Sequence, residues 1–138
     1  MVLNKTRKAY FNIAKEVSAL SDFPRVKIGA AAVYGHHVIS SGCNLRKTMP
    51  IQKKYNKYRF SEDTNHFAHA EITCLKPLIR RQDIDFKHVD LYIYREDKNN
   101  RPSLSRPCPS CMKFITELGI LHIYYSNYGG YSHEEILA

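Results

Sequence analysis

The sequence predicts an α/β fold in which a mixed sheet of four to five strands is flanked by helices. Two observations support this prediction. Helical and strand-like apolar patterns alternate along the 138 residues, and the strand-like segments are joined first by a short turn and later by a helix. A short turn makes two strands antiparallel, whereas a helical crossover makes them parallel. The apolar content of 43% is that of a globular chain, so we expect one domain over residues 1–138.

The first half of the chain is expected to form a helix followed by a β-hairpin. Apolar residues recur every three or four positions in Lys5–Leu20, and Asn4 is a suitable N-cap. Val26–Tyr34 and Val38–Cys43 have the pattern of two strands around a short turn that contains glycine and histidine. The small residues Ala30–Ala32 in the first strand predict close packing of a helix or a ligand.

The second half continues the alternation of helix and strand. Pro77 is expected to kink or end one helix, and Gly119 to end another. The predicted elements are, in order, a helix at Ala68–Arg80, a strand at His88–Arg95, a helix at Pro109–Leu118, a buried strand at Ile120–Ser126 and a short helix at Ser132–Leu137.

Two short segments contain residue types that bind zinc. The tripeptide HAE at residues 69–71 offers an imidazole and a carboxylate, and PCPSC at residues 107–111 offers two thiols. Three protein ligands leave a fourth tetrahedral position open, which is how catalytic zinc sites differ from structural ones. The pattern H-x-E followed by P-C-x-x-C is a known signature of zinc-dependent nucleobase deaminases. The sequence therefore predicts that His69, Cys108 and Cys111 bind zinc.

The spacing of the two cysteines suits this role. If a helix begins at about Cys108, both sulfur atoms lie on one face near the positive end of the helix dipole, which favours the thiolate that zinc needs. Pro109 fits the first helical position, where its missing N–H costs nothing. Glu71 is expected to take a proton from a zinc-activated water and to pass it to a ring nitrogen and then to the leaving amine.

Three longer stretches resemble the zinc-dependent cytidine and deoxycytidylate deaminase superfamily, most closely its deoxycytidylate branch. They are HAEITCLKPL from residue 69, LYIYRED from residue 91 and RPCPSCMKFITELGILHIYYS from residue 106, and the resemblance extends over about Asn4–Tyr131. It implies a three-layer α-β-α fold. It also implies that His69, Cys108 and Cys111 hold zinc and that Glu71 is the proton shuttle.

The same resemblance indicates which residues contact the substrate. In the family an asparagine at the end of the second strand, here Asn44, contacts the sugar and the base. The backbone amide at Ala70 reads the oxygen of the base. We expect Ser105 and Arg106, in the charged loop before the cysteines, to form part of the pocket wall, and we include Tyr124 among the substrate-binding residues.

Two features depart from the resembling family. The deoxycytidylate branch often has GYNG where this chain has GCNL at residues 42–45, which puts in doubt the allosteric nucleotide control tied to that motif. The family usually continues through its last helix into a fifth strand, whereas this sequence ends within the expected helix. We therefore expect either a minimal four-stranded sheet or a domain that is short at its C-terminus.

The segment RKTMPIQKKYNKYRF, residues 46–60, is rich in basic and aromatic residues and contains no acidic one. This composition suits contact with phosphates and stacking on bases, although a basic run is more often solvated surface. Because the segment leads from Asn44 toward His69, we expect it to border the mouth of the active site. The candidate phosphate-binding residues are Arg46, Lys47, Lys53 and Lys54.

The leading prediction is a deaminase that converts cytosine to uracil in a cytidine or deoxycytidine nucleotide and releases ammonia. A net charge of +8 keeps single-stranded DNA or RNA open as an alternative substrate. Adenosine in tRNA fits less well, because the loop before the cysteines lacks the glutamate usual in that group. A zinc-stabilised nucleic-acid-binding module without turnover is the alternative of a different class, and Glu71 argues against it, since a structural site has no need of that carboxylate.

The remaining cysteines and the hydropathy bear on the compartment. Cys43 and Cys74 lie in apolar patterns and are expected to be buried, inert thiols. Zinc-bound thiolates suit a reducing compartment, so we expect a cytoplasmic protein. The sequence contains no run of about 18 apolar residues and no signal-peptide pattern, so we expect no membrane partner. Members of the resembling family form homo-oligomers, and nothing in the sequence defines such an interface.

Overall fold

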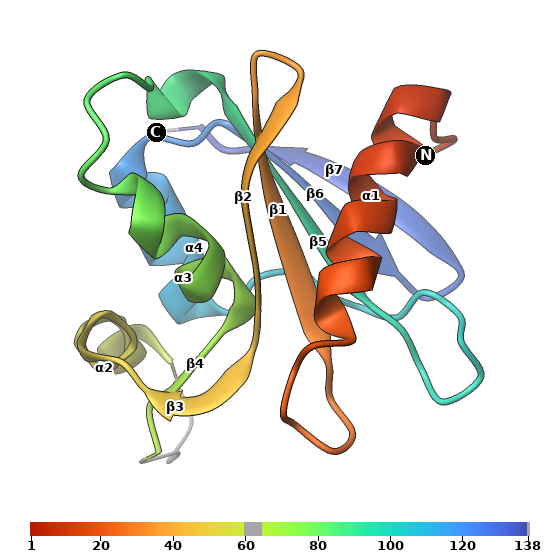
Figure 1. Cartoon of the computed structure of the whole chain (residues 1–138), viewed down its shortest axis with the longest axis horizontal. Helices are drawn as coiled ribbons and strands as arrows, with labels where there is room; N and C mark the ends of the chain where they lie inside the picture. The colour runs from red at the N-terminus through yellow and green to blue at the C-terminus, as the bar shows by residue number, and fades with distance from the viewer. Residues whose placement is uncertain (60–64, 138) are drawn as a thin grey trace.

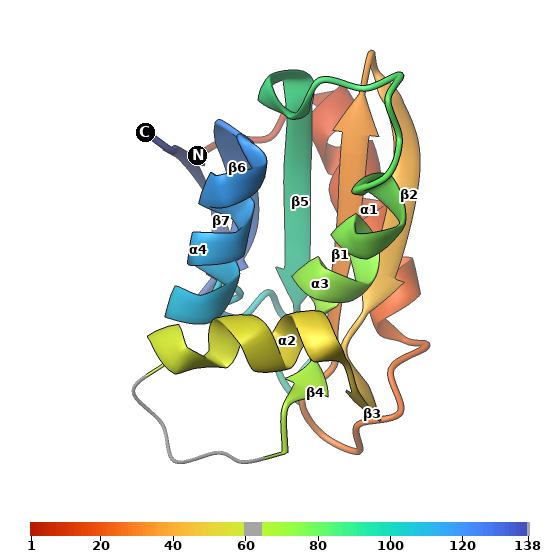
Figure 2. The same ribbon diagram turned by 90° about the vertical axis from the view of Figure 1, so that its left-hand side faces the viewer.

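The computed structural model describes residues 1–59 and 65–137, which form three layers (Figures 1 and 2). Phe60, the last residue of the basic segment, lies outside the described residues. No helix in the described part is long and apolar enough to cross a membrane. The elements are α1 (Lys5–Ser18), β1 (Ile28–Tyr34), β2 (His37–Cys43), β3 (Leu45–Thr48), α2 (Pro50–Tyr55), the 3₁₀ turn η1 (Asn56–Tyr58), β4 (Phe67–Ala68), α3 (Ala70–Leu75), the 3₁₀ turns η2 (Lys76–Leu78) and η3 (Phe86–His88), β5 (Val89–Arg95), α4 (Pro109–Leu118), β6 (His122–Asn127) and β7 (Gly130–Glu135).

The middle layer is a mixed five-stranded sheet with the order β2-β1-β5-β6-β7. Neighbouring strands of this sheet pair antiparallel, except for β5 and β6, which are parallel and are linked through α4. Helix α1 covers one face of the sheet, and α3 and α4 cover the other, with α2 beside their N-terminal ends (Figures 1 and 2). The predicted α/β fold with a mixed sheet between helices is therefore confirmed.

Small residues let helices approach the sheet closely on both faces. A Cβ atom added to Gly29 in β1 would lie 1.9 Å from the backbone oxygen of Ala14 in α1. One added to Gly42 in β2 would lie 2.7 Å from the backbone nitrogen of Cys74 in α3. Ala30–Ala32 are fully buried between these layers. The close packing expected for the first strand is therefore present, and helix α1 provides it on one side.

The two faces of the sheet differ in composition. On the α3 and α4 face, Leu91 and Ile93 of β5 belong to a largely aliphatic core. On the α1 face, Tyr92 and Tyr94 of the same strand pack with Phe11 in an aromatic cluster. Strand β5 is therefore buried on both sides, although its alternating pattern also fits a strand with one polar face.

The C-terminal segment differs from its predicted structure. Residues predicted to begin a short helix, Ser132–Leu137, instead belong largely to β7, which pairs antiparallel with β6. The reason is the turn between the strands, where Gly129 adopts a φ of +81°, a conformation that glycine allows and that closes a hairpin. Strand β7 thus supplies the fifth strand, and the sheet is not the minimal four-stranded form.

The helix predicted at Ala68–Arg80 is shorter and divided. It begins at Ala70 and ends at Leu75, where the 3₁₀ turn η2 takes over. Pro77 within this turn lacks the N–H that a continuing α-helix needs, as the sequence predicted. Ile79, which follows this turn, is exposed.

Candidate active site

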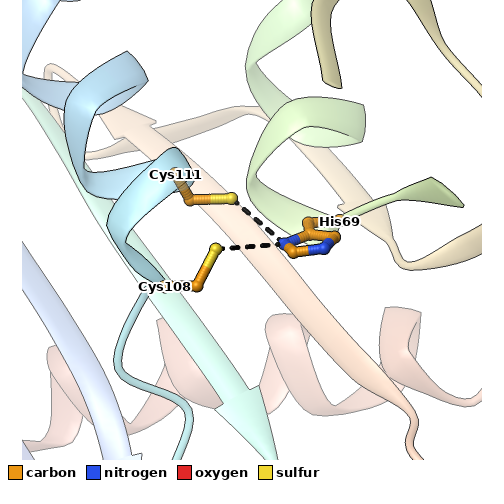
Figure 3. A group of neighbouring side chains, drawn as sticks. All are labelled: His69, Cys108 and Cys111. Atoms are coloured by element: carbon orange, nitrogen blue, oxygen red, sulfur yellow. Dashed lines mark hydrogen bonds between the residues drawn. The ribbon is translucent and has the colours of Figure 1, made fainter. Parts of the chain in front are cut away.

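The candidate zinc ligands lie at the N-terminal ends of two neighbouring helices. His69 is the N-cap of α3, directly after the short strand β4, and Cys108 is the N-cap of α4. Pro109 occupies the first position of α4, so Cys111 follows Cys108 by one turn on the same side. Both cysteine side chains point from α4 toward the ring of His69 (Figure 3).

The three donor atoms have the spacing that a tetrahedral zinc ion requires. Nδ1 of His69 lies 3.4 Å from Sγ of Cys108 and 3.3 Å from Sγ of Cys111. Bonds of about 2.1 Å to nitrogen and about 2.3 Å to sulfur place such atoms about 3.6 Å apart at tetrahedral angles. Within residues 1–59 and 65–137, this is the only group of three such ligand atoms within 4.8 Å of one another. The residues present therefore fit zinc.

Hydrogen bonding in the cluster favours a thiolate at Cys108. Its pKa is lowered to about 3, chiefly by a hydrogen bond from Cys111. His69 and Ser110 also lower it, and Oγ of Ser110 lies 3.0 Å from Sγ of Cys108. The interaction between the two sulfur atoms, together with burial, raises the pKa of Cys111. The cluster therefore favours at Cys108 the deprotonated sulfur that zinc binds.

Glu71 is buried beside the ligands, in the first turn of α3, with 4% of its surface exposed. Burial raises the pKa of its carboxyl group, while the nearby His69 acts in the opposite direction with a smaller effect. Glu71 also contributes to the raised pKa of the Cys111 thiol, and it lines the same cavity as His69 and Cys108. A carboxyl group in this position is suited to accept a proton and to return it.

A cavity of about 350 Å³ reaches these residues. Its volume lies at the lower end of the range for small-molecule sites, about 300–1,000 Å³. Phe23 and Phe67 form an aromatic part of the wall, with ring centroids 5.9 Å apart and an interplanar angle of 74°. The cavity thus combines a reactive centre with apolar surface for a planar ring.

Asn44 lies in the wall of this cavity, where the resemblance placed a substrate contact. Its Oδ1 accepts a hydrogen bond from the backbone N–H of Ile28 at 2.9 Å, and its Nδ2 donates to the backbone oxygen of Val26 at 2.7 Å. Asn44 therefore fixes the segment before β1 to the end of β2. Each end of its amide can make one more hydrogen bond, which is available for a substrate.

Ser105 also lies in the cavity wall, where it forms a buried pair with Ser126. Its Oγ donates to the backbone oxygen of Ile93 at 3.0 Å and lies 2.8 Å from Oγ of Ser126. Ser126 in turn accepts from the backbone N–H of Arg95 at 3.0 Å and donates to the oxygen of Ser103 at 2.7 Å. These bonds tie the loop before the cysteines to β5 and β6.

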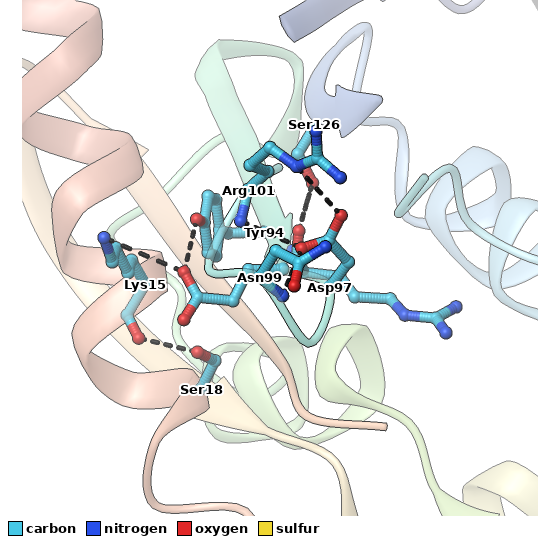
Figure 4. A network of polar contacts seen from close by, with 9 residues as sticks. Lys15, Ser18, Tyr94, Asp97, Asn99, Arg101 and Ser126 are labelled. Carbon is cyan, nitrogen blue, oxygen red and sulfur yellow. Dashed lines mark hydrogen bonds and ion pairs between the residues drawn. The ribbon is translucent and has the colours of Figure 1, made fainter. Parts of the chain in front are cut away.

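The tip of the same loop is ordered by Asp97 (Figure 4). Its Oδ1 accepts hydrogen bonds from the backbone N–H groups of Asn99 at 2.8 Å and Arg101 at 3.1 Å. Bonding to the Arg101 backbone is the main reason why the pKa of Asp97 is lowered. On the other side, Nζ of Lys15 in α1 lies 3.7 Å from Glu96. The loop that carries the pocket wall is therefore fixed at both ends.

Three arginine residues line the cavity, and their partners differ. Arg106 forms two hydrogen bonds with Glu134, at 2.6 Å and 3.1 Å. Nη1 of Arg59 lies 3.4 Å from Nε2 of His69. No acidic side chain in the described ranges forms an ion pair with Arg95. Arg95 thus places uncompensated positive charge at the wall of the cavity.

Tyr124, included among the predicted substrate-binding residues, does not line this cavity. Its ring lies on the opposite face of the sheet, with centroids 4.5 Å from both Tyr92 and His133. Side chains alternate between faces along a strand, so Tyr125 points to the face of the active site and Tyr124 to that of α1.

The remaining predicted substrate contacts are Ala70 and the candidate phosphate ligands of the basic segment. Ala70 is fully buried at the first position of α3, and its side chain does not line the cavity. The basic segment forms most of β3, together with α2 and η1, and it reaches the cavity through Arg59. None of its candidate phosphate ligands lines the described cavity; these are Arg46, Lys47, Lys53 and Lys54.

Several residues of the site were not predicted from the sequence. Phe23 and Phe67 belong to segments read only as connections, and no spacing identifies them. Arg95 ends a predicted strand, a position at which ligands often bind in α/β sheets, and this was an available signal. Gln52 was not singled out within the basic segment. Pro50 was an available signal for the start of a helix, and in that helix Gln52 and Tyr55 lie on the same, buried side.

Comparisons with known proteins agree with this geometry. The model of the family described as cytidine and deoxycytidylate deaminase zinc-binding region matches residues 4–127. The apo dCMP deaminase of the cyanophage S-TIM5 has a TM-score of 0.65 and 22% identity, over 91% of this chain and 86% of that chain. Cytidine deaminase from Burkholderia pseudomallei has a TM-score of 0.67 and 18% identity, over 96% and 93% of the two chains. No curated protein matches this chain.

At these identities the solved structures show a shared fold, whereas the family match covers most of the sequence. The matched residues include all three candidate zinc ligands and Glu71. The predicted resemblance is therefore confirmed, and so is zinc as the cofactor that suits the ligand set. This protein is a deaminase that belongs to the zinc-dependent cytidine and deoxycytidylate deaminase family.

Proposed function

We propose that this deaminase acts on the cytosine of a free nucleotide of the deoxycytidylate type. The observation that carries the proposal is that Glu71 and the unpaired guanidinium of Arg95 line one cavity. A guanidinium forms strong, charge-assisted hydrogen bonds with phosphate, which a neutral nucleoside does not need. The cyanophage dCMP deaminase that shares this fold has been solved with dCMP and dUMP, with a TM-score of 0.63 and 20% identity over 91% and 83% of the two chains.

The chain's own residues supply the proton transfers of the reaction. Zinc held by His69, Cys108 and Cys111 supplies, when bound, the electrophilic centre that makes water nucleophilic at neutral pH. Glu71 accepts the proton released by the attacking water and donates it to the ring nitrogen beside the reacting carbon. It then carries the proton of the new hydroxyl group to the departing amine. One water is consumed, the bond between the ring carbon and the exocyclic amine breaks, and the uracil nucleotide and ammonia are released.

The orientation of the substrate follows from the wall residues. The apolar surface of Phe23 and Phe67 suits the pyrimidine ring, and the remaining hydrogen-bonding positions of Asn44 suit the sugar or the base. The guanidinium group of Arg95 then binds the phosphate group of the nucleotide. The three functions belong to one cavity, which is what a small, complete substrate requires.

A single-stranded polynucleotide is supported less well, because the two aromatic residues of the basic segment that the structure describes, Tyr55 and Tyr58, are already packed. Tyr55 is 8% exposed, its ring lies 5.2 Å from that of Phe114, and its hydroxyl group bonds to Glu117. The Tyr58 ring has the Nζ atom of Lys113 at 5.5 Å from its centroid. These rings are therefore not presented as a stacking platform for successive bases.

A substrate panel tests the proposal directly. Ammonia release by the zinc-loaded chain should be measured with dCMP, CMP, deoxycytidine, cytidine and a cytosine-containing single-stranded oligonucleotide. We expect kcat/KM for a nucleotide to exceed that for its nucleoside by at least about tenfold, or about 1.4 kcal/mol. Equal values for the two would contradict a phosphate site. Highest activity on the oligonucleotide, falling steeply with salt, would favour the polynucleotide instead.

The proposed location follows from the ligand chemistry. Cys108 and Cys111 must remain reduced to bind zinc, and Cys43 and Cys74 are unpaired buried thiols. A reducing compartment such as the cytoplasm suits all four, and we propose it as the site of action. Measurement of free thiols in protein freshly isolated from its native cells tests this: four reduced cysteines support it, and a disulfide contradicts it.

A further inference from the structure

Helix α2 contributes a buried polar side chain that touches both segments carrying zinc ligands. Gln52 has no exposed surface. Its Oε1 accepts a hydrogen bond from the backbone N–H of His69 at 3.0 Å. Its Nε2 donates to Oδ1 of Asn56 at 2.7 Å and lies 3.5 Å from Oγ of Ser110. A buried amide costs free energy unless its polar atoms are bonded, so these contacts fix its orientation.

Two contacts of Gln52 involve the zinc ligands, one directly and one through Ser110. Oγ of Ser110 lies 3.0 Å from Sγ of Cys108, and His69 is itself a ligand. One side chain thus links the backbone of the first ligand to the hydroxyl group that contacts the sulfur of the second. Groups placed in this way orient metal ligands, and their loss typically weakens metal binding by about 10–100-fold.

The side-chain amide of Gln52 also connects the metal centre to the turn η1 that follows α2, through its hydrogen bond to Asn56. Nδ2 of Asn56, which lies in η1 directly after α2, is 2.9 Å from Nδ1 of His66. His66 in turn precedes β4 and the ligand His69. Gln52 and Asn56 therefore hold the start of α3 from two sides, through the backbone of His69 and through the segment before it.

We propose that Gln52 is a positioning residue of the zinc centre, which sets the spacing between the N-terminal ends of α3 and α4. The contact with His69 fixes one end, and the contact with Ser110 fixes the other. The inference rests on the zinc ligands and not on the identity of the nucleotide, so its test uses zinc binding and needs no substrate.

The test compares Gln52→Leu with Gln82→Leu. Leucine has a similar volume but makes none of the three polar contacts, and Gln82 is the other glutamine of the chain and is exposed. The rate of zinc transfer from folded protein to a chelator should rise about 10–100-fold for Gln52→Leu. The visible spectrum of the Co²⁺-substituted protein, which depends on ligand geometry, should shift. Gln82→Leu should match the wild type in both measurements.

A second variant keeps the test decisive if leucine prevents folding. Gln52→Glu retains an acceptor for the N–H of His69 but loses the donor to Ser110 and Asn56, so zinc transfer should again be faster. A merely structural role would lower the melting temperature of these variants while leaving the zinc-transfer rate and the cobalt spectrum unchanged. That result would overturn the proposal.

Discussion

The metal centre and the basic segment at residues 46–60, of which the structure describes 46–59, are neighbours in the fold, yet the sequence predicted one of them far better than the other. In the metal centre, Nδ1 of His69 lies 3.4 Å from Sγ of Cys108 and 3.3 Å from Sγ of Cys111, although the cysteines follow the histidine by 39 and 42 positions in the sequence. In the basic segment, the four candidate phosphate ligands stay outside the cavity, and the contacts to the site come from Arg59 and the neutral residue Gln52. Defined donors at a fixed spacing specify a site, whereas composition specifies only a charged surface.

The basic segment also shows what its charges do instead. Nζ of Lys54 lies 5.4 Å from the centroid of the Tyr55 ring, and Nζ of Lys57 lies 5.2 Å from that of Tyr58. Lysine side chains cover aromatic rings in this way while their charged ends remain in water. The aromatic residues of the segment therefore pack against the protein, and the lysines beside them lie toward solvent.

The largest expected effect comes from the metal centre. Glu71→Gln keeps the shape of the side chain but cannot accept a proton, so kcat should fall by roughly 10²–10⁴-fold. Zinc content should stay at the wild-type level, since Glu71 is not a ligand. Steady-state kinetics and metal analysis of the same preparation check both parts. Full activity in a zinc-loaded Glu71→Gln protein would remove the proton shuttle from the account.

A smaller effect should separate the cavity wall from the basic segment. Arg95→Gln should raise KM for dCMP by about tenfold, about 1.4 kcal/mol, because it removes the unpaired charge that faces the phosphate. The double variant Lys53→Gln/Lys54→Gln should leave this KM nearly unchanged, because neither lysine lines the cavity. Deoxycytidine kinetics serve as the control for both. A larger KM increase in the lysine variant would reverse the comparison between the two regions.

The smallest effect concerns Arg106, the wall arginine that has a partner. Its hydrogen bond lowers the pKa of Glu134, so the pair stabilises the fold at neutral pH, above the unfolded pKa of that carboxyl group. This contribution is lost as the pH falls through the folded pKa. Both side chains are partly exposed, at 47% and 33%, so the contribution is at most about 1 kcal/mol.

The measurement is the free energy of unfolding of wild type and Glu134→Gln. The difference between them should be present at neutral pH and should diminish as the pH falls through the lowered pKa of Glu134 in the folded wild type. A difference that stays constant across this range would show that the pair contributes through packing and not through charge.

Local signals explain why much of the fold could be predicted. Asn4 caps α1 through a 2.8 Å hydrogen bond to the backbone N–H of Arg7, and Gly119 ends α4 with a φ of +97°. Pro109 starts α4 at its first position. Such residues act on their own neighbours, and the three zinc donors are recognisable from type and spacing alone, so a single sequence is sufficient to find them.

The failures required information that local sequence does not carry. The face on which Tyr124 lies could not be predicted, because the face of a strand residue depends on the register with neighbouring strands, and adjacent tyrosines give no hint of it. Strand β7 is mostly polar and half-exposed, so its pattern did not show it as a strand. Arg95 differs from Arg106 only through Glu134, a partner 28 residues from Arg106 in the sequence.

The most direct test of the account is zinc-edge X-ray absorption on the zinc-loaded protein. His69, Cys108 and Cys111 with one open position predict two sulfur atoms at about 2.3 Å and two nitrogen or oxygen atoms at about 2.0–2.1 Å. Glu71→Gln should give the same spectrum. Three or more sulfur ligands, none at all, or a changed first coordination shell in Glu71→Gln would contradict the assignment of the site.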